Sequence, residues 1–139
     1  EDFLGLPFAG ALEISATKTG RGTHVLHTFF QMEDGSFLAF FDDPNTPFDF
    51  KAQRDFDLHI ALEVDHQRLE PMLERGRDAG IESRGISDHG FIDSIYFRDP
   101  NGYVIELTAT RPGQEGNVGD EGDPHEILKK WTRDKAANQ

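Results

Sequence analysis

The chain has 139 residues, of which 36% are hydrophobic and 11% aromatic, and its formal net charge is −12 with a pI near 4.7. This size and composition suffice for one small globular core, whereas the strong negative charge argues against nucleic-acid backbones and anionic membranes as partners. The chain has no cysteine and therefore no disulfide. It shows no signal peptide and no transmembrane run, so we expect a cytoplasmic location.

Three strands are predicted in the first third of the chain, at Phe8–Ala16, His24–Met32 and Phe37–Asp42. Asp34-Gly35 is the expected hairpin turn before the last of them. Many of the twelve phenylalanines lie on these strands. They would suit a cavity for an aromatic or otherwise apolar substrate, and ordinary core packing explains them equally well. The phenylalanines in question are Phe29, Phe30, Phe37, Phe40 and Phe41.

A strand–helix–strand–strand–strand pattern follows. Asp65 is placed to cap the helix, and Gly80 suits a left-handed conformation at its C-terminal end. Leu69 and Leu73 fall at helical spacing. The expected elements are a strand at Asp57–Val64, a helix at Asp65–Ala79, and strands at Ile81–Ser87, Phe91–Arg98 and Tyr103–Ala109.

The end of the chain changes character after Thr110. Residues 111–123 are rich in Gly, Glu and Asp and are typical of a linker. Pro124–Ala137 is predicted as a helix with Ile127, Leu128 and Trp131 on one face, and we expect Trp131 to dock it on the core or on a partner subunit. The predicted organisation is therefore an incomplete first module at 1–44, a joining loop at 45–54, a second module at 55–110, and an acidic linker with a C-terminal helix at 111–139.

The most informative stretch is Ser87–Glu106, which reads SDHGFIDSIYFRDPNGYVIE. It contains His89, then Tyr96, then the tight turn Asp99-Pro100-Asn101-Gly102, and finally Glu106 in the middle of the returning strand. A carboxylate at mid-strand is costly to bury unless it is paired or bound to a metal. The hairpin alone leaves two interpretations about equally open: a metal ligand, or a solvent-facing glutamate.

This order of residues resembles the signature of the extradiol ring-cleaving dioxygenases, and it departs from it at Ser87, where that family usually has Gly, Asn, Thr or an aliphatic residue. The resemblance implies that Glu106 is a metal ligand. It implies His89 as a general acid/base and Tyr96 as a hydrogen-bond donor to a metal-bound substrate oxygen. Phe91 and Asp93 are candidates for substrate contact, although Asp93 could face either side of the sheet.

Extradiol dioxygenases and glyoxalases belong to the vicinal oxygen chelate superfamily, whose βαβββ module carries a His on its first strand and a Glu on its last. The resemblance to this superfamily implies an α+β fold in which two such modules form a cupped mixed sheet. A lone strand histidine is more often structural than a ligand, but here the resemblance implies that His59 and Glu106 bind one metal. Counted from the turn glycines, Ala39 occupies the place of Glu106 in the first module.

The first strand of the first module is absent from the sequence, and the resemblance implies that a third ligand lies there, before Glu1. His24 and His27 are weaker candidates, because they lie on opposite faces of their strand and are expected to be surface or packing residues. His66 and His125 lie on polar segments and are expected to be solvated. No cluster of arginine or lysine is expected near the metal.

The activity implied is ring opening of an aromatic diol with O₂ at Fe(II). A glyoxalase-type lyase or isomerase, or a thiol transferase, at Mn(II), Zn(II) or Ni(II) is the alternative enzyme. A metal-free ligand-binding protein of the bleomycin resistance kind is the third hypothesis, and the presence of both His59 and Glu106 speaks against it. The expected partners are a small aromatic or vicinal-oxygen compound and a second copy of the chain in a homodimer.

Overall fold

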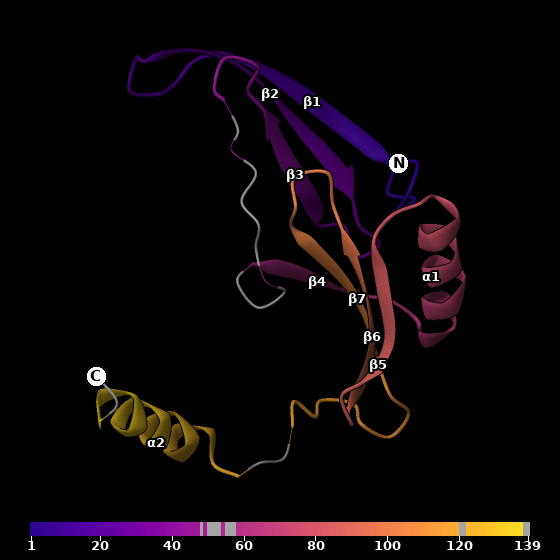
Figure 1. Cartoon of the computed structure of the whole chain (residues 1–139). Coiled ribbons are helices and arrows are strands. Elements are labelled where there is room, and N and C mark those ends of the chain that lie inside the picture. The colour runs from indigo at the N-terminus through magenta and orange to yellow at the C-terminus, as the bar shows by residue number, and fades with distance from the viewer. Residues whose placement is uncertain (48, 50–53, 55–57, 120–121, 138–139) are drawn as a thin grey trace. The chain divides into compact units, whose positions relative to one another are not determined.

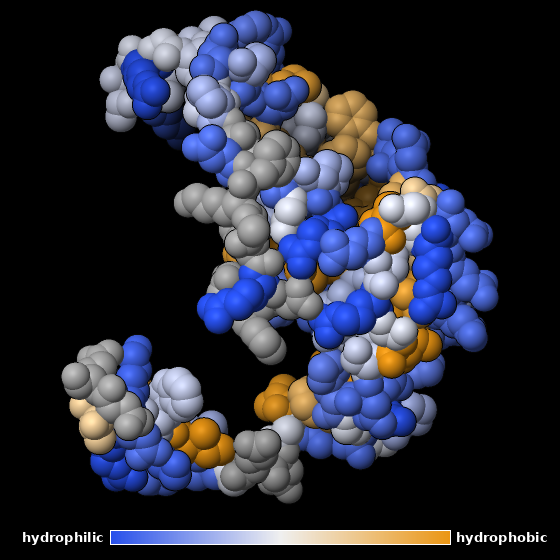
Figure 2. Space-filling view, in the orientation of Figure 1, coloured by the Kyte–Doolittle hydropathy of each residue, from blue (hydrophilic) through white to orange (hydrophobic). Residues whose placement is uncertain are grey.

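The computed structural model describes residues 1–47, 49, 54, 58–119 and 122–137 of the chain (Figure 1). The chain divides into two compact units, Glu1–Ala52 and Gln53–Gln139, which are described separately below. No helix in the described part is long and apolar enough to cross a membrane. Apolar side chains appear at the surface as orange patches between hydrophilic ones (Figure 2).

The first unit is a three-stranded antiparallel sheet in the order β1-β2-β3. Its strands are β1 (Phe8–Ala16), β2 (Gly22–Gln31) and β3 (Phe37–Asp42). The predicted strands are confirmed, and only the ends of β2 differ. Gly35 has a φ of 84°, which the hairpin between β2 and β3 requires and which a glycine adopts without strain.

Aromatic rings lie on both faces of this sheet. The Phe30 ring lies 5.5 Å from that of Phe8 and 5.9 Å from that of Phe40, whereas on the other face His27 stacks on Phe41 at 3.9 Å. None of the described residues of this unit is buried, and Phe41 is 64% exposed. The phenylalanines therefore pair across strands and build no closed core within this unit.

The second unit is a four-stranded mixed sheet in the order β4-β7-β6-β5. Its strands are β4 (His59–Glu63), β5 (Ser83–Asp88), β6 (Ile92–Arg98) and β7 (Val104–Thr110). β4 pairs with β7 in parallel, and the other pairs are antiparallel. The predicted βαβββ order is confirmed, and it places the first and last strands of the unit side by side in the sheet.

Helix α1 (Leu69–Asp78) packs on one face of this sheet, beside β5 (Figure 1). Alternation along β6 and β7 turns one set of apolar side chains toward the helix. On that face the buried apolar side chains of the sheet are Ile95, Phe97, Leu107 and Ala109, and those of the helix are Leu69 and Leu73. Val104 is also buried, on the opposite face, which carries Glu106.

The ends of the helix differ in how well the sequence predicts them. Gly80 has a φ of 68°, and the N–H of Ile81 donates to the carbonyl of Gly76 at 2.9 Å, so the expected left-handed C-terminal end is confirmed. The predicted Asp65 cap is wrong, because its side chain makes no capping hydrogen bond. Its backbone carbonyl instead accepts from the N–H of Arg68 at 2.8 Å, in a 3₁₀ turn at His66–Arg68 that precedes α1.

Helix α2 covers Pro124–Ala137, the range that the sequence predicts. Its described residues include no buried one, and Trp131 is 66% exposed. The expectation that Trp131 docks α2 on the core of its own chain is therefore wrong for this structure. The physical reason is that the helix offers only the narrow apolar stripe of Ile127, Leu128 and Trp131 among charged residues.

Candidate metal centre

Glu106 lies in the middle of β7, between the two strands that flank it. Tyr96 of β6 is its register partner on one side and Ala61 of β4 on the other. The Glu106 side chain is only 9% exposed. The interpretation of Glu106 as a solvent-facing residue is therefore wrong, and its carboxylate needs a partner.

His59 supplies that partner from the first position of β4. Its Nε2 atom lies 3.4 Å from Oε2 of Glu106, and its side chain is 39% exposed. Two donors on adjacent corners of one metal ion, with bonds of about 2.0–2.2 Å, are about 3.0–3.4 Å apart. The distance and the donor types fit two ligands of a divalent ion, and the exposed side of His59 leaves the position open to solvent.

His89 and Tyr96 form the second pair of the site. His89 Nε2 and the Tyr96 hydroxyl are 2.8 Å apart, with the rings edge to face at 6.5 Å between centroids. The hairpin between β5 and β6 positions His89, because Asp88 accepts a hydrogen bond from the N–H of Gly90 at 2.7 Å. That N–H, and after it the Arg111 side chain, lowers the pKa of Asp88, so this acceptor stays ionised.

The four residues that the sequence places at the site are thus brought together on one face of the second unit. His59 contacts Glu106, Glu106 stands opposite Tyr96, and Tyr96 bonds His89. Directly opposite residues of paired strands share a face. The arrangement combines a carboxylate–imidazole donor pair with a phenol and a second imidazole that can exchange a proton.

Asp93 lies on the opposite face of β6 from Tyr96. It is 7% exposed, and its Oδ2 atom lies 2.8 Å from Nε2 of His66 and 3.4 Å from Nε of Arg111. The structure does not bring Asp93 to the other four site residues. His66 is exposed, as expected, and its imidazole also contacts this buried carboxylate, a partner that the sequence does not predict. His125 is exposed, as expected.

Phe91 precedes β6 and is half-buried. Its carbonyl accepts a hydrogen bond from the N–H of Arg111 at 3.0 Å, and its ring approaches Gly119, where an added Cβ would lie 3.7 Å away. Phe91 therefore contacts the segment that follows β7.

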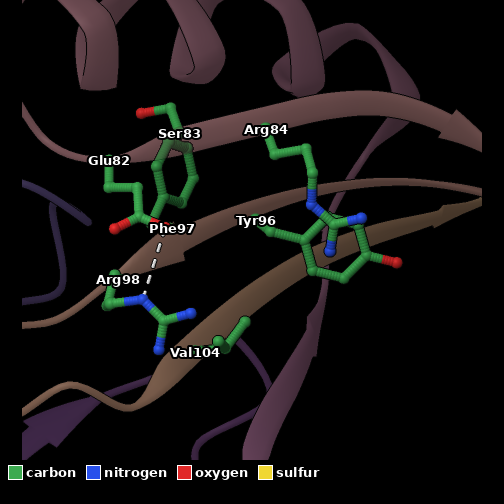
Figure 3. A pocket seen from close by; sticks show the side chains of 7 residues that line it. All are labelled: Glu82, Ser83, Arg84, Tyr96, Phe97, Arg98 and Val104. Atoms are coloured by element: carbon green, nitrogen blue, oxygen red, sulfur yellow. Dashed lines mark hydrogen bonds and ion pairs between the residues drawn. The ribbon is translucent and has the colours of Figure 1, made fainter. Parts of the chain in front are cut away.

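Arg84 is a neighbour of Tyr96 that the sequence did not single out. It is the register partner of Tyr96 on β5, and its guanidinium carbon lies 4.3 Å from the centroid of the Tyr96 ring (Figure 3). Arg98 lies on the same face of the sheet as Arg84, and both arginines line a small pocket together with Tyr96. The sequence prediction is of no arginine or lysine cluster near the metal, and it does not single out Arg84. The signal that could have found Arg84 is the hairpin register of β5 on β6.

The described residues contain no group of three or more His, Asp or Glu side chains arranged to hold a metal ion. His24 pairs with Glu13 at 2.7 Å, with both side chains largely exposed. His27 lies between the rings of Phe29 and Phe41, at 4.2 and 3.9 Å. Both histidines have the surface or packing surroundings that the sequence favours for them.

Titration of the Tyr96 phenol gives a testable consequence of this geometry. Burial, and after it the negative charge of Glu106, raises the pKa of Tyr96 above the ordinary value of 10.0. The chain has two tyrosines, so ultraviolet titration of the protein and of a Tyr96→Phe variant isolates this transition. We expect the phenol transition that disappears in Tyr96→Phe to be the one whose pKa lies above the ordinary value. In Glu106→Gln the pKa of that transition should be lower than in the unaltered protein.

The sign of the effect on stability follows from the raised pKa. The contribution of Tyr96 to the free energy of unfolding is fully present below the pKa that the phenol has in the unfolded chain. This contribution is lost as the pH rises through the pKa of the phenol in the folded protein. A Tyr96 transition at or below the ordinary value would show that the phenol is neither buried nor next to a charged carboxylate.

No protein-family model and no curated protein matches the chain, whereas solved structures do. A glyoxalase family protein from Bacillus cereus has a TM-score of 0.58 at 20% identity, covering 78% of this chain and 80% of its own. A glyoxalase/dioxygenase from Nostoc punctiforme has a TM-score of 0.53 at 25% identity, covering 61% of this chain and 60% of its own.

A third similar structure is the fosfomycin resistance protein FosX from Listeria monocytogenes, solved in complex with Mn(II) and a sulfate ion. Its TM-score is 0.50 at 24% identity, and the match covers 76% of each chain. These likenesses confirm the predicted α+β fold class. The chain has the glyoxalase-like fold, and its structural neighbours are consistent with the vicinal oxygen chelate superfamily that the sequence resembles.

Proposed function

We propose that the chain is a metal-dependent enzyme in which His59 and Glu106 bind one divalent ion. The observation that carries the proposal is the 3.4 Å approach of His59 Nε2 to Glu106 Oε2, on the same face as the contact between His89 and Tyr96. The buried carboxylate and the half-exposed imidazole are donor types that together suit a divalent ion. The leading reaction is extradiol cleavage of an aromatic diol with O₂, and Fe(II) is the favoured metal.

A bound divalent ion would supply Lewis acidity to adjacent oxygens of the substrate, and Fe(II) would add redox chemistry toward O₂. The chain's own residues would orient the substrate and transfer protons to and from its oxygens. Tyr96 is a neutral phenol at neutral pH, all the more so because burial and Glu106 raise its pKa, and it is placed to donate a hydrogen bond to a substrate oxygen while His89 Nε2–H donates to the phenol oxygen. With Nε2 unprotonated, His89 is placed to act as base through the phenol: it accepts the Tyr96 proton as the phenol oxygen takes the proton of the substrate hydroxyl, and the reverse transfer returns it.

The second candidate is a glyoxalase-type lyase or isomerase, or a thiol transferase, at Mn(II), Zn(II) or Ni(II). The Mn(II) complex of FosX, a protein of the same fold, favours keeping this candidate. It would use the same His59–Glu106 pair, and it differs in needing no O₂. A metal-free ligand-binding protein is the third candidate, and it gives the buried carboxylate of Glu106 no role.

Elemental analysis combined with O₂ uptake tests these candidates. The protein is purified without chelator or metal-affinity resin, and its metal content is compared with that of a His59→Ala/Glu106→Ala variant. About one iron per chain, absent from the variant, with O₂ uptake on adding catechols, supports the dioxygenase. Stoichiometric Mn, Zn or Ni without O₂ uptake selects the second candidate. A protein that holds no metal and takes none up on titration rules out both enzymes.

A further inference from the structure

A row of side chains crosses the site face of the second unit. Arg84 of β5 stands opposite Tyr96 of β6, which stands opposite Glu106 of β7, which in turn stands opposite Ala61 of β4. Because directly opposite residues share a face, the guanidinium of Arg84 and the His59–Glu106 pair lie on the same side of the sheet. Tyr96 lies between them.

The position of Arg84 suits an anion. Arg84 is exposed, and its guanidinium carbon lies over the ring of Tyr96, 4.3 Å from the ring centroid. Stacking on an aromatic face holds the group by cation–π attraction and fixes its plane. A guanidinium has five N–H donors in a rigid planar fork, a geometry that matches the two oxygens of a carboxylate.

Arg98, the other arginine of this face, has a different role. Its Nη1 donates to the carbonyl of Gly102 at 2.8 Å, and its Nε lies 3.4 Å from the Glu82 carboxylate (Figure 3). These contacts tie Arg98 to the β6–β7 turn and to the segment before β5. Of the two arginines, Arg84 is the one stacked on the phenol of the proposed site.

The net charge of the whole chain affects which ligands the site can attract. With a formal net charge of −12, the protein repels an anionic small molecule unless a local cation attracts it. A cation placed beside the donor pair therefore marks the end of the site where a negative group of the substrate would be stabilised.

We propose that Arg84 is a specificity-determining residue that binds a carboxylate of the substrate, while the vicinal oxygens of the same molecule meet the His59–Glu106 pair. This inference rests on the proposed function. The backbones of Arg84 and Glu106 are two strands apart, roughly 10 Å. The Arg84 guanidinium lies over the ring of Tyr96, on the strand between them, so it is closer to the donor pair than its backbone is and suits a substrate of the size of one substituted ring. The substrate class is thus a small aromatic diol with a carboxylate on the side remote from its hydroxyls, lying across Tyr96.

Binding of a matched pair of compounds tests the proposal. The probes are 3,4-dihydroxybenzoate and its methyl ester, which share the diol and differ in the negative charge. Each is titrated calorimetrically, without O₂, into the Mn(II)-loaded protein, into Arg84→Gln and into Arg77→Gln. Arg77 is an exposed arginine on α1, so its replacement makes the same change in net charge away from the site face.

We expect the protein and Arg77→Gln to bind the acid more tightly than the ester by on the order of tenfold. Arg84→Gln should lose this preference while keeping the affinity for the ester. An equal affinity for acid and ester in the unaltered protein, a preference that survives in Arg84→Gln, or binding of neither compound overturns the role of Arg84. The affinity for Mn(II) is measured separately. If Mn(II) binds, any of these outcomes overturns only the role of Arg84 and leaves the metal proposal standing. If Mn(II) does not bind, the metal proposal itself has failed.

Discussion

Replacing Glu106 by Gln, or His59 by Gln, is expected to lower the affinity of the protein for Mn(II) or Fe(II) by at least about a hundredfold, since loss of a partner that only orients a ligand already costs about 10- to 100-fold. The reason is that Glu106→Gln replaces an anionic carboxylate by a neutral, weaker amide ligand and His59→Gln removes the imidazole, at the two donor atoms that lie 3.4 Å apart. Both substitutions keep the size of the side chain, so the fold should persist. Calorimetric titration of the metal into each variant gives the affinity.

Glu63→Gln is the matched control for this prediction. Glu63 is an exposed carboxylate on β4, two residues beyond Ala61 on the face that carries His59, and its register partner is Thr108. Its loss removes the same charge from the same strand without touching the donor pair. Metal affinity in Glu63→Gln should equal that of the unaltered protein. An equal loss in this control would mean that the metal responds to charge in general and not to a defined pair of ligands.

Gly76→Ala is expected to destabilise the protein by about 1–3 kcal/mol, the usual cost of overpacking a core. The direction is notable, since the same change in an exposed helix stabilises by about 1 kcal/mol. A Cβ at Gly76 would lie 2.6 Å from Oγ of Ser83 and 2.9 Å from Cδ1 of Phe97, and still closer to Cε1 of that ring. Urea unfolding of the variant measures the effect.

Two further variants separate crowding from other causes. Glu74→Ala, at an exposed position of α1, should change the free energy of unfolding by no more than about 0.5 kcal/mol. In a Phe97→Leu background the ring is gone, so Gly76→Ala should cost less than it does alone. Unaltered or increased stability in Gly76→Ala would mean that α1 does not approach β5 and β6 as closely as the structure shows.

The sequence predicts the elements of this fold well, because their signals are local. Alternation and aromatic content delimit β1 and β3, Gly80 marks the end of α1, and the apolar stripe predicts α2. The pairing of His59 with Glu106 came from the resemblance to the vicinal oxygen chelate module, whose first and last strands are adjacent. Periodicity alone left the role of Glu106 open and favoured a structural role for His59.

Features that depend on register and tertiary contacts were not predicted. Arg84 reaches Tyr96 only because β5 pairs with β6 in one register, and a register shift between Gly85 and Ser87 interrupts the simple alternation. The His66–Asp93 contact joins residues 27 positions apart through the packing of a 3₁₀ turn on the sheet. The Asp65 cap failed because the turn preceding α1 satisfies its backbone groups by itself.

The central claim is that His59 and Glu106 bind one divalent ion, and pulsed electron paramagnetic resonance of the Mn(II)-loaded protein tests it most directly. Electron spin echo modulation detects nitrogen nuclei of imidazoles coordinated to Mn(II). We predict nitrogen modulation in the unaltered protein and in His66→Gln, and its loss or clear reduction in His59→Gln. Modulation that is absent from the unaltered protein, or unchanged in His59→Gln, would contradict the claim that His59 is a ligand.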